Sequence, residues 1–195
     1  MGKNLVENFI REDLLFSLCG LNCGLCTMHF DGYCPGCGGG EGNQSCKIAK
    51  CSLEHGEIEY CFQCRNFPCE KYQMSEEYDS FITHRNRFKD LKKMKAVGTK
   101  AYQNEQIEKT AMLKDLLENY NDGRKKTFFC LAVNLLELDD LQAVMEKMKI
   151  VEQEKDVPVK EKALYLTELF QKTASQRSVI LKLRRKPAKS KEKQE

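Results

Sequence analysis

Ten of the eleven cysteines lie in one stretch of the chain, between residues 19 and 69. Three pairs are separated by two residues, and four further cysteines lie around them: Cys23/Cys26, Cys34/Cys37 and Cys61/Cys64, with Cys19, Cys46, Cys51 and Cys69. Two intervening residues allow a tight turn to direct both sulfurs at one ion, and Gly24, Pro35 and Gly36 are turn-forming residues. Three such pairs close together indicate metal binding, so we expect all ten cysteines to be metal ligands.

Zinc in a structural role is the metal that this pattern predicts. The cysteine count is odd, and residues 1–13 mix acidic and basic side chains where a secretion signal needs an apolar core, so we expect a cytoplasmic protein with reduced thiols. Two tetrathiolate zinc ions use eight cysteines. The other two cysteines are spare, bridge two metals, or form a third site with His29, His55 or water. As metal ligands, thiolates are favoured over either histidine.

An iron–sulfur cluster is the alternative to zinc. The Cys19, Cys23 and Cys26 spacing is that of the cluster motif of radical-SAM enzymes. Those enzymes usually carry an aromatic residue at the position of Leu25, and they need a partial α/β barrel that a mostly helical remainder cannot supply. The alternative is therefore a simple cluster that serves electron transfer or sensing.

The composition changes near residue 70, from glycine-rich and aperiodic to rich in Leu, Lys, Glu and Met at helical spacing. We expect a small cysteine-rich metal-knuckle domain with little regular secondary structure over residues 14–72. An all-α helical domain should follow over residues 76–180. We expect residues 182–195 to form a basic disordered tail.

Apolar spacing and end signals predict the individual helices. We expect one through Phe81–Met94 that Gly98 ends, a second from Thr99 to about Tyr120, a buried helix or strand over 128–136, a helix over Leu141–Ile150 capped by Asp139 or Asp140, and a last helix from Pro158 to Ala174. Arg11–Leu18 should form a short helix or strand. Cys130 falls inside the apolar 128–136 segment and is predicted to be a buried core thiol rather than a ligand.

The net charge of +3 originates in the tail, because Lys182–Glu195 carries +5 and residues 1–181 carry −2. The tail lacks aromatic residues that could stack on bases, so nucleic-acid binding through the knuckles and tail is a secondary alternative. We expect the helical half to bind a macromolecular partner, a protein rather than a nucleic acid, and to have no membrane association.

Sequence motifs for catalysis are lacking. The chain has no Gly-x-Ser-x-Gly or His-Glu-x-x-His, and Gly36–Gly40 is not followed by the Lys-Ser/Thr of a phosphate-binding loop. We therefore expect a binding or regulatory protein rather than an enzyme.

The cysteine pattern resembles that of a prokaryotic cysteine-rich family of unknown function that is presumed to bind zinc. The resemblance rests on Cys19-Gly-Leu-Asn-Cys-Gly-Leu-Cys26, Cys34-Pro-Gly-Cys37, Cys46 and Cys51, and Cys61-Phe-Gln-Cys-Arg-Asn-Phe-Pro-Cys69. The segments 84–98 and 121–136 are similar to the helical extension of longer members. The resemblance implies that each of the ten cysteines is a metal ligand, and it implies no activity.

Overall fold

The computed structural model describes residues 9–40, 46–73, 78–154 and 157–186. Within these ranges the chain forms helices and loops, and it has no β-strand. The expected helical and cysteine-rich character is thus confirmed. No helix in the described ranges combines the length and the apolar character needed to cross a bilayer.

The described part of residues 9–73 contains short helical pieces joined by loops. In chain order these are η1 (Cys23–Leu25), α1 (Thr27–Phe30), α2 (Lys47–Glu54), η3 (Cys61–Gln63) and α3 (Glu70–Gln73). Arg11–Leu18 is neither helix nor strand, which corrects our expectation. The carboxylate of Asp13 accepts hydrogen bonds from the backbone N–H groups of Leu15 and Phe16, so a side-chain turn replaces regular structure there.

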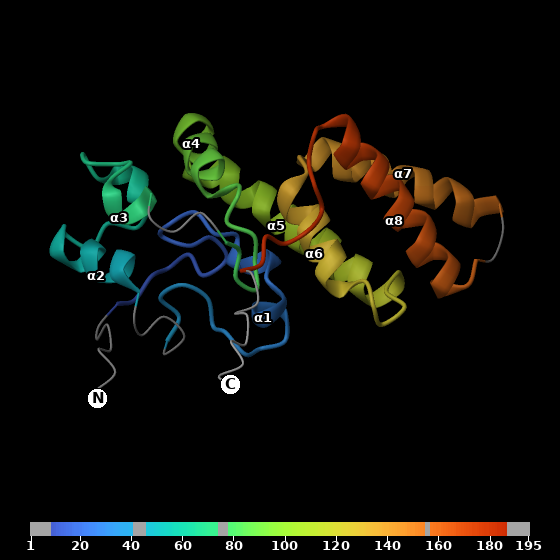
Figure 1. Cartoon of the computed structure of the whole chain (residues 1–195), viewed down its shortest axis with the longest axis horizontal. Helices are drawn as coiled ribbons and strands as arrows, with labels where there is room; N and C mark the ends of the chain where they lie inside the picture. The colour runs from blue at the N-terminus through green and yellow to red at the C-terminus, as the bar shows by residue number, and fades with distance from the viewer. Residues whose placement is uncertain (1–8, 41–45, 74–77, 155–156, 187–195) are drawn as a thin grey trace, which may run out of the picture.

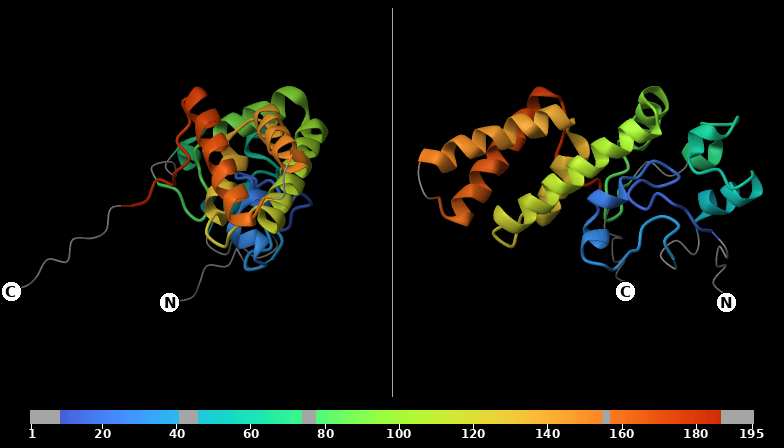
Figure 2. Two further views of the ribbon diagram at one scale, coloured as in Figure 1. Left: turned by 90° about the vertical axis from the view of Figure 1, so that its right-hand side faces the viewer. Right: turned by 180° about the vertical axis from the view of Figure 1, so that it is seen from behind.

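Longer helices follow: α4 (Arg87–Val97), α5 (Thr99–Asn119), α6 (Lys126–Leu135), α7 (Leu138–Glu154) and α8 (Val159–Gln176). α7 and α8 lie side by side at one end of the molecule, and α2 and α3 lie at the other end (Figure 1). α5 runs diagonally between them and packs on both α4 and α6, as the view from behind also shows (Figure 2).

The helix boundary at Gly98 is confirmed, because this residue follows α4 with a φ of +90°, a conformation that glycine adopts without strain. Gly98 is also the residue that precedes α5, so Thr99 is the first helical residue and not the expected cap. Phe81 lies outside α4 and is 66% exposed, since the chain between it and Arg87 is not helical.

The other helix starts are also shifted slightly from the expected positions. α7 begins at Leu138, so Asp139 and Asp140 lie in its first turn, where carboxylates interact favourably with the helix dipole. Pro158 is the N-cap of α8 rather than a member of its first turn. The segment 128–136 is helical through residue 135, and residues 129–136 are buried as predicted.

The cysteine-rich half and the helical half share two hydrophobic cores. One core is formed mainly by α5–α8 and includes Leu25 of η1, which is fully buried. The other joins Phe16, Tyr60 and Tyr72 to residues of α4 and α5, namely Leu91, Met94 and Tyr102. Residues 14–72 therefore do not form a distinct unit with a core of their own, and the domain limits at 14–72 and 76–180 stay predictions.

The chain after α8 turns back toward the middle of the molecule (Figure 1). Arg184 forms an ion pair with the buried carboxylate of Asp79 at 3.0 Å, and Arg85 donates hydrogen bonds to the carbonyls of Ile180 and Lys182 at 2.6 and 3.0 Å. Lys182 and Arg184 of the expected disordered tail thus have defined contacts. Residues 187–195 lie outside the described part of the chain.

Candidate metal centres

Two of the three Cys-x2-Cys pairs form the same tight turn. The backbone N–H of Cys26 donates to the carbonyl of Cys23 at 3.0 Å, and Cys64 donates to Cys61 in the same way at 3.1 Å. These turns are η1 and η3. All ten clustered cysteines carry free thiols and are partly buried. The turns have the form that metal-binding pairs require.

Four cysteines line a cavity. The space in it that the centre of a water molecule can occupy is about 30 Å3. They come from α2, from both ends of η3 and from the residue before α3, and we call them the cavity cysteines: Cys51, Cys61, Cys64 and Cys69. The other walls are mainly apolar and consist of Ile48, Ile58, Phe67 and Tyr72, with His55 and Lys71. Burial raises the pKa of Cys61, and so do the neighbouring thiols of Cys19, Cys69 and Cys51.

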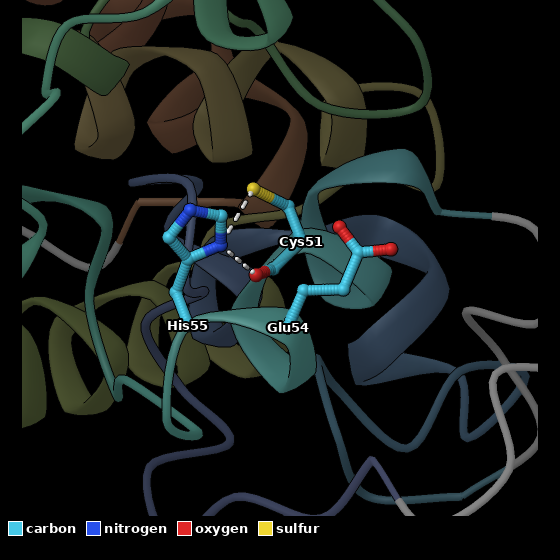
Figure 3. A group of neighbouring side chains, drawn as sticks. All are labelled: Cys51, Glu54 and His55. Carbon is cyan, nitrogen blue, oxygen red and sulfur yellow. Dashed lines mark hydrogen bonds between the residues drawn. The ribbon is translucent and has the colours of Figure 1, made fainter.

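Beside this cavity, Cys51, Glu54 and His55 lie on one turn at the end of α2 (Figure 3). Their ligand atoms lie within 4.8 Å of one another. The Nδ1 atom of His55 is 2.8 Å from the carbonyl oxygen of Cys51 and 3.6 Å from its sulfur. Because Nδ1 donates to this carbonyl, only Nε2 of the ring is available to bind a metal.

A second group consists of Cys19, Cys23, Cys37 and Cys46, which we call the loop cysteines. Burial raises the pKa of Cys23 above its usual range, and the neighbouring thiols of Cys37 and Cys19 raise it further. Burial likewise raises the pKa of Cys37 to about 11, against the opposing effect of Arg11, and Cys19 and Cys46 also raise it. These pKa shifts mean that the thiols bind protons firmly unless a cation compensates their negative charge.

Backbone N–H groups are directed at two of the loop sulfurs. Cys37 donates its N–H to the sulfur of Cys23, and Leu18 donates to the sulfur of Cys37. Such hydrogen bonds stabilise the thiolate form and orient the sulfur.

The remaining two clustered cysteines, Cys26 and Cys34, lie near each other at α1. Burial raises the pKa of Cys26, while hydrogen bonds from the N–H groups of Met28 and His29 lower it, and Cys34 raises it. Cys130 of α6 lies close to Cys26, and its burial raises its pKa to about 12. At 6% exposure Cys130 is the buried core thiol that we predicted. The groups also approach one another, because the thiol of Cys19 acts on Cys61 and that of Cys26 acts on Cys23.

The sulfurs within these groups are more widely spaced than in a closed zinc site. All eleven cysteines are among the described residues, and Cys51, Glu54 and His55 form the one group of three metal-binding side chains within 4.8 Å of one another. In a tetrathiolate zinc site, with Zn–S bonds of about 2.3 Å, the sulfurs are about 3.8 Å apart. No three thiols in the described chain therefore have this spacing.

Arg11 holds the cysteine loops together from the inside, and no motif in the sequence marks this residue. Its buried guanidinium donates to the carbonyls of Asp13, Phe16 and Cys37 and twice to the carbonyl of Glu59, at 2.9–3.3 Å. It also forms an ion pair with the carboxylate of Glu59 at 2.9 Å. One side chain therefore fixes the loop before Cys19, the loop at Cys37 and the loop before Cys61.

A buried polar cluster connects the first cysteines to the long helices. Asn22 donates to the carboxylate of Asp90 on α4 at 2.7 Å, and Tyr102 of α5 donates to Asn22 at 3.2 Å. Arg87 donates to the carbonyl of Cys19 at 3.1 Å. Burial raises the pKa of Asp90 to about 6, although Lys109 and Asn22 oppose this rise. The residues that orient Cys19 and Cys23 thus lie far away in sequence, on α4 and α5.

Two histidines lie beside a hydroxyl or thiol in the described chain: Nε2 of His84 is 3.1 Å from the exposed hydroxyl of Ser80, and Nδ1 of His55 is 3.6 Å from the sulfur of Cys51. His29 and His55 each have a ring nitrogen within 3.0 Å of a backbone carbonyl. The side chains gathered in the cysteine region are of the types that bind metals. Comparisons of the chain with protein families, with curated proteins and with solved structures give no match in any of the three.

Proposed function

We propose that the chain is a metal-thiolate protein in which the ten clustered cysteines bind metal ions, zinc foremost, and that the metal has a structural role. One observation carries this proposal. The ten thiols are partly buried, many of them lie near one another, and burial and mutual repulsion raise the pKa of Cys23, Cys37 and Cys61. Such grouping is unfavourable for bare thiolates and favourable once cations replace the protons.

A structural role follows from what the cysteine region contains. Its five helical pieces have at most eight residues each, and its large buried side chains mostly pack on α4 and α5. Helices this short are not stable by themselves, whereas structural zinc contributes roughly 10–16 kcal/mol to folding. Metal binding is therefore expected to order these loops against the helices.

We further propose that the helical half binds a protein partner. Several basic side chains of the helices are paired with acids, as in Lys93 with Glu105 and Glu137 and Lys162 with Glu152, so their charge is not free to bind a polyanion. Apolar side chains that are about half exposed lie on α7 and α8: Ile150, Val159 and Leu164. This surface chemistry favours a protein over a nucleic acid.

Metal analysis of the full chain purified without oxygen tests the proposal. We expect stoichiometric metal, and we expect chelation to abolish amide-exchange protection in residues 9–73. The double variant Cys61→Ser/Cys64→Ser should lose metal, whereas the matched control Cys130→Ser should keep it. Native-like exchange protection in the metal-free chain would exclude the structural role.

A further inference from the structure

The cavity between the cavity cysteines is larger than a single metal ion requires. The centre of a water molecule stays at roughly 3.2 Å from a sulfur, whereas zinc binds four thiolates at about 2.3 Å. A closed zinc site therefore has no room for a water centre. The cavity offers about 30 Å3 of such space, which is room for about two water molecules.

The lining of this space is rich in sulfur. Its walls are the four thiols, the mainly apolar side chains of Ile48, Ile58, Phe67 and Tyr72, and the exposed side chains of His55 and Lys71. Four cysteines on a mainly apolar lining are the ligand set that holds an iron–sulfur cluster.

We propose that the cavity cysteines, Cys51, Cys61, Cys64 and Cys69, hold a cluster of four irons and four sulfides in place of a single zinc ion. The inference rests on the proposed metal-thiolate function and names the cofactor of one of its groups. In such a cluster each thiolate binds a different iron, so the sulfurs are farther apart than around one shared ion. The wide spacing of the thiols agrees with this arrangement.

The charges at the cavity also fit an iron–sulfur cluster. Four thiolates give the cluster a net negative charge, and two cations lie beside them. Lys71 lies beside the sulfur of Cys51 and also forms an ion pair with Glu54 at 3.6 Å, and Arg87 lies near Cys61. Hydrogen bonds to the sulfurs and limited solvent access are the features by which proteins set cluster potentials.

The test is the metal and sulfide content of the full-length protein purified without oxygen. We expect four irons and four acid-labile sulfides per chain, with visible absorbance that bleaches when dithionite donates one electron to the cluster. Two results together would overturn this inference and leave the metal-thiolate function intact: zinc without iron at all sites, and failure of ferric and ferrous iron in equal amounts with sulfide to rebuild a cluster in the metal-free chain. A chain that binds no metal would overturn both.

Two variants locate the cluster. Cys64→Ser should abolish the visible absorbance, whereas Cys130→Ser, at the core thiol outside the ten proposed ligands, should retain it, and the reverse result would refute the assignment. Because Cys64→Ser can fail to fold, Lys71→Gln supplies a second measurement. Removing this positive charge should lower the midpoint potential of an otherwise intact cluster. Lys50→Gln on α2 makes the same change in net charge, and because Lys50 does not line the cavity it should have a smaller effect.

Discussion

Replacement of Arg11 by methionine tests whether one guanidinium holds the cysteine loops together. Methionine keeps much of the length of the side chain but removes all five side-chain hydrogen bonds and the ion pair with Glu59. The side chain of Arg11 is 1% exposed and that of Glu59 is 31% exposed. The variant therefore leaves a partly buried carboxylate and four carbonyl groups without their donor.

The size of the effect follows from these contacts. Hydrogen bonds to a charged group contribute about 1.5–3 kcal/mol each, but the carbonyls are partly buried and can bind water again after the substitution. Removal of one partner of a buried ion pair costs about 3–5 kcal/mol. We expect a loss of this size in the free energy of unfolding, which corresponds to a decrease in Tm of roughly 6–20 °C for a chain of this length.

Urea unfolding followed by circular dichroism measures the loss, with every variant compared at saturating metal because bound metal itself stabilises the fold. Arg11→Lys keeps the charge but not the fork of donors, so it should lose roughly half as much. The exposed Arg124 offers a control, Arg124→Met, that should change stability by less than about 0.5 kcal/mol. The double variant Arg11→Met/Glu59→Gln should lose less than the sum of its single variants. A loss below about 1 kcal/mol, or strict additivity, would refute the reasoning.

Three further substitutions test other contacts. Because the pKa of Asp90 is raised to about 6 in the folded protein, this carboxyl group holds its proton at pH values where the unfolded chain has released it. The ionisation of Asp90 therefore destabilises the fold, by about 3 kcal/mol at pH 7 and about half of that at pH 5. Asp90→Asn should therefore gain stability relative to the native chain as the pH rises, and a pH-independent difference in urea unfolding would contradict this. Gly20→Ala places a methyl group 2.5 Å from the carbonyl oxygen of Arg87. It should lower the Tm by more than Gly32→Ala does, because Gly32 has a similar positive φ but open space around it. Equal Tm decreases would disprove the steric cause. Arg184→Met should cost about 2 kcal/mol and speed amide exchange in residues 178–186, and unchanged exchange there would show that the ion pair does not hold this segment.

The local structure was largely predictable from the sequence. The helices α5 and α6 follow from the spacing of apolar residues, and the end of α4 follows from Gly98. The burial of Cys130 follows from its apolar neighbours. The Cys-x2-Cys turns follow from a spacing that permits few other conformations, as the matching turns η1 and η3 show. These features depend on residues within a few positions of one another.

The joining of the two halves could not be predicted, because it depends on contacts between residues far apart in the chain. Nothing near Asn22 indicates that Asp90 will be its partner 68 residues later, and Arg11 has no motif around it. The grouping of the cysteines is of the same kind. Cys46 and Cys51 lie five residues apart at α2, yet Cys51 lines the cavity and Cys46 lies near Cys37, because the helix directs them to different sides.

The shared cores have a consequence for the order in which the protein is made. The ribosome synthesises the cysteine region first, whereas the partners of Asn22 on α4 and α6 lie 68 and 112 residues later. At about 5–20 residues per second, the thiols precede the first of these partners by about 3–14 s. During this interval the nascent thiols lack their final packing, so metal delivery or thiol protection during translation should influence how much of the protein reaches its folded form.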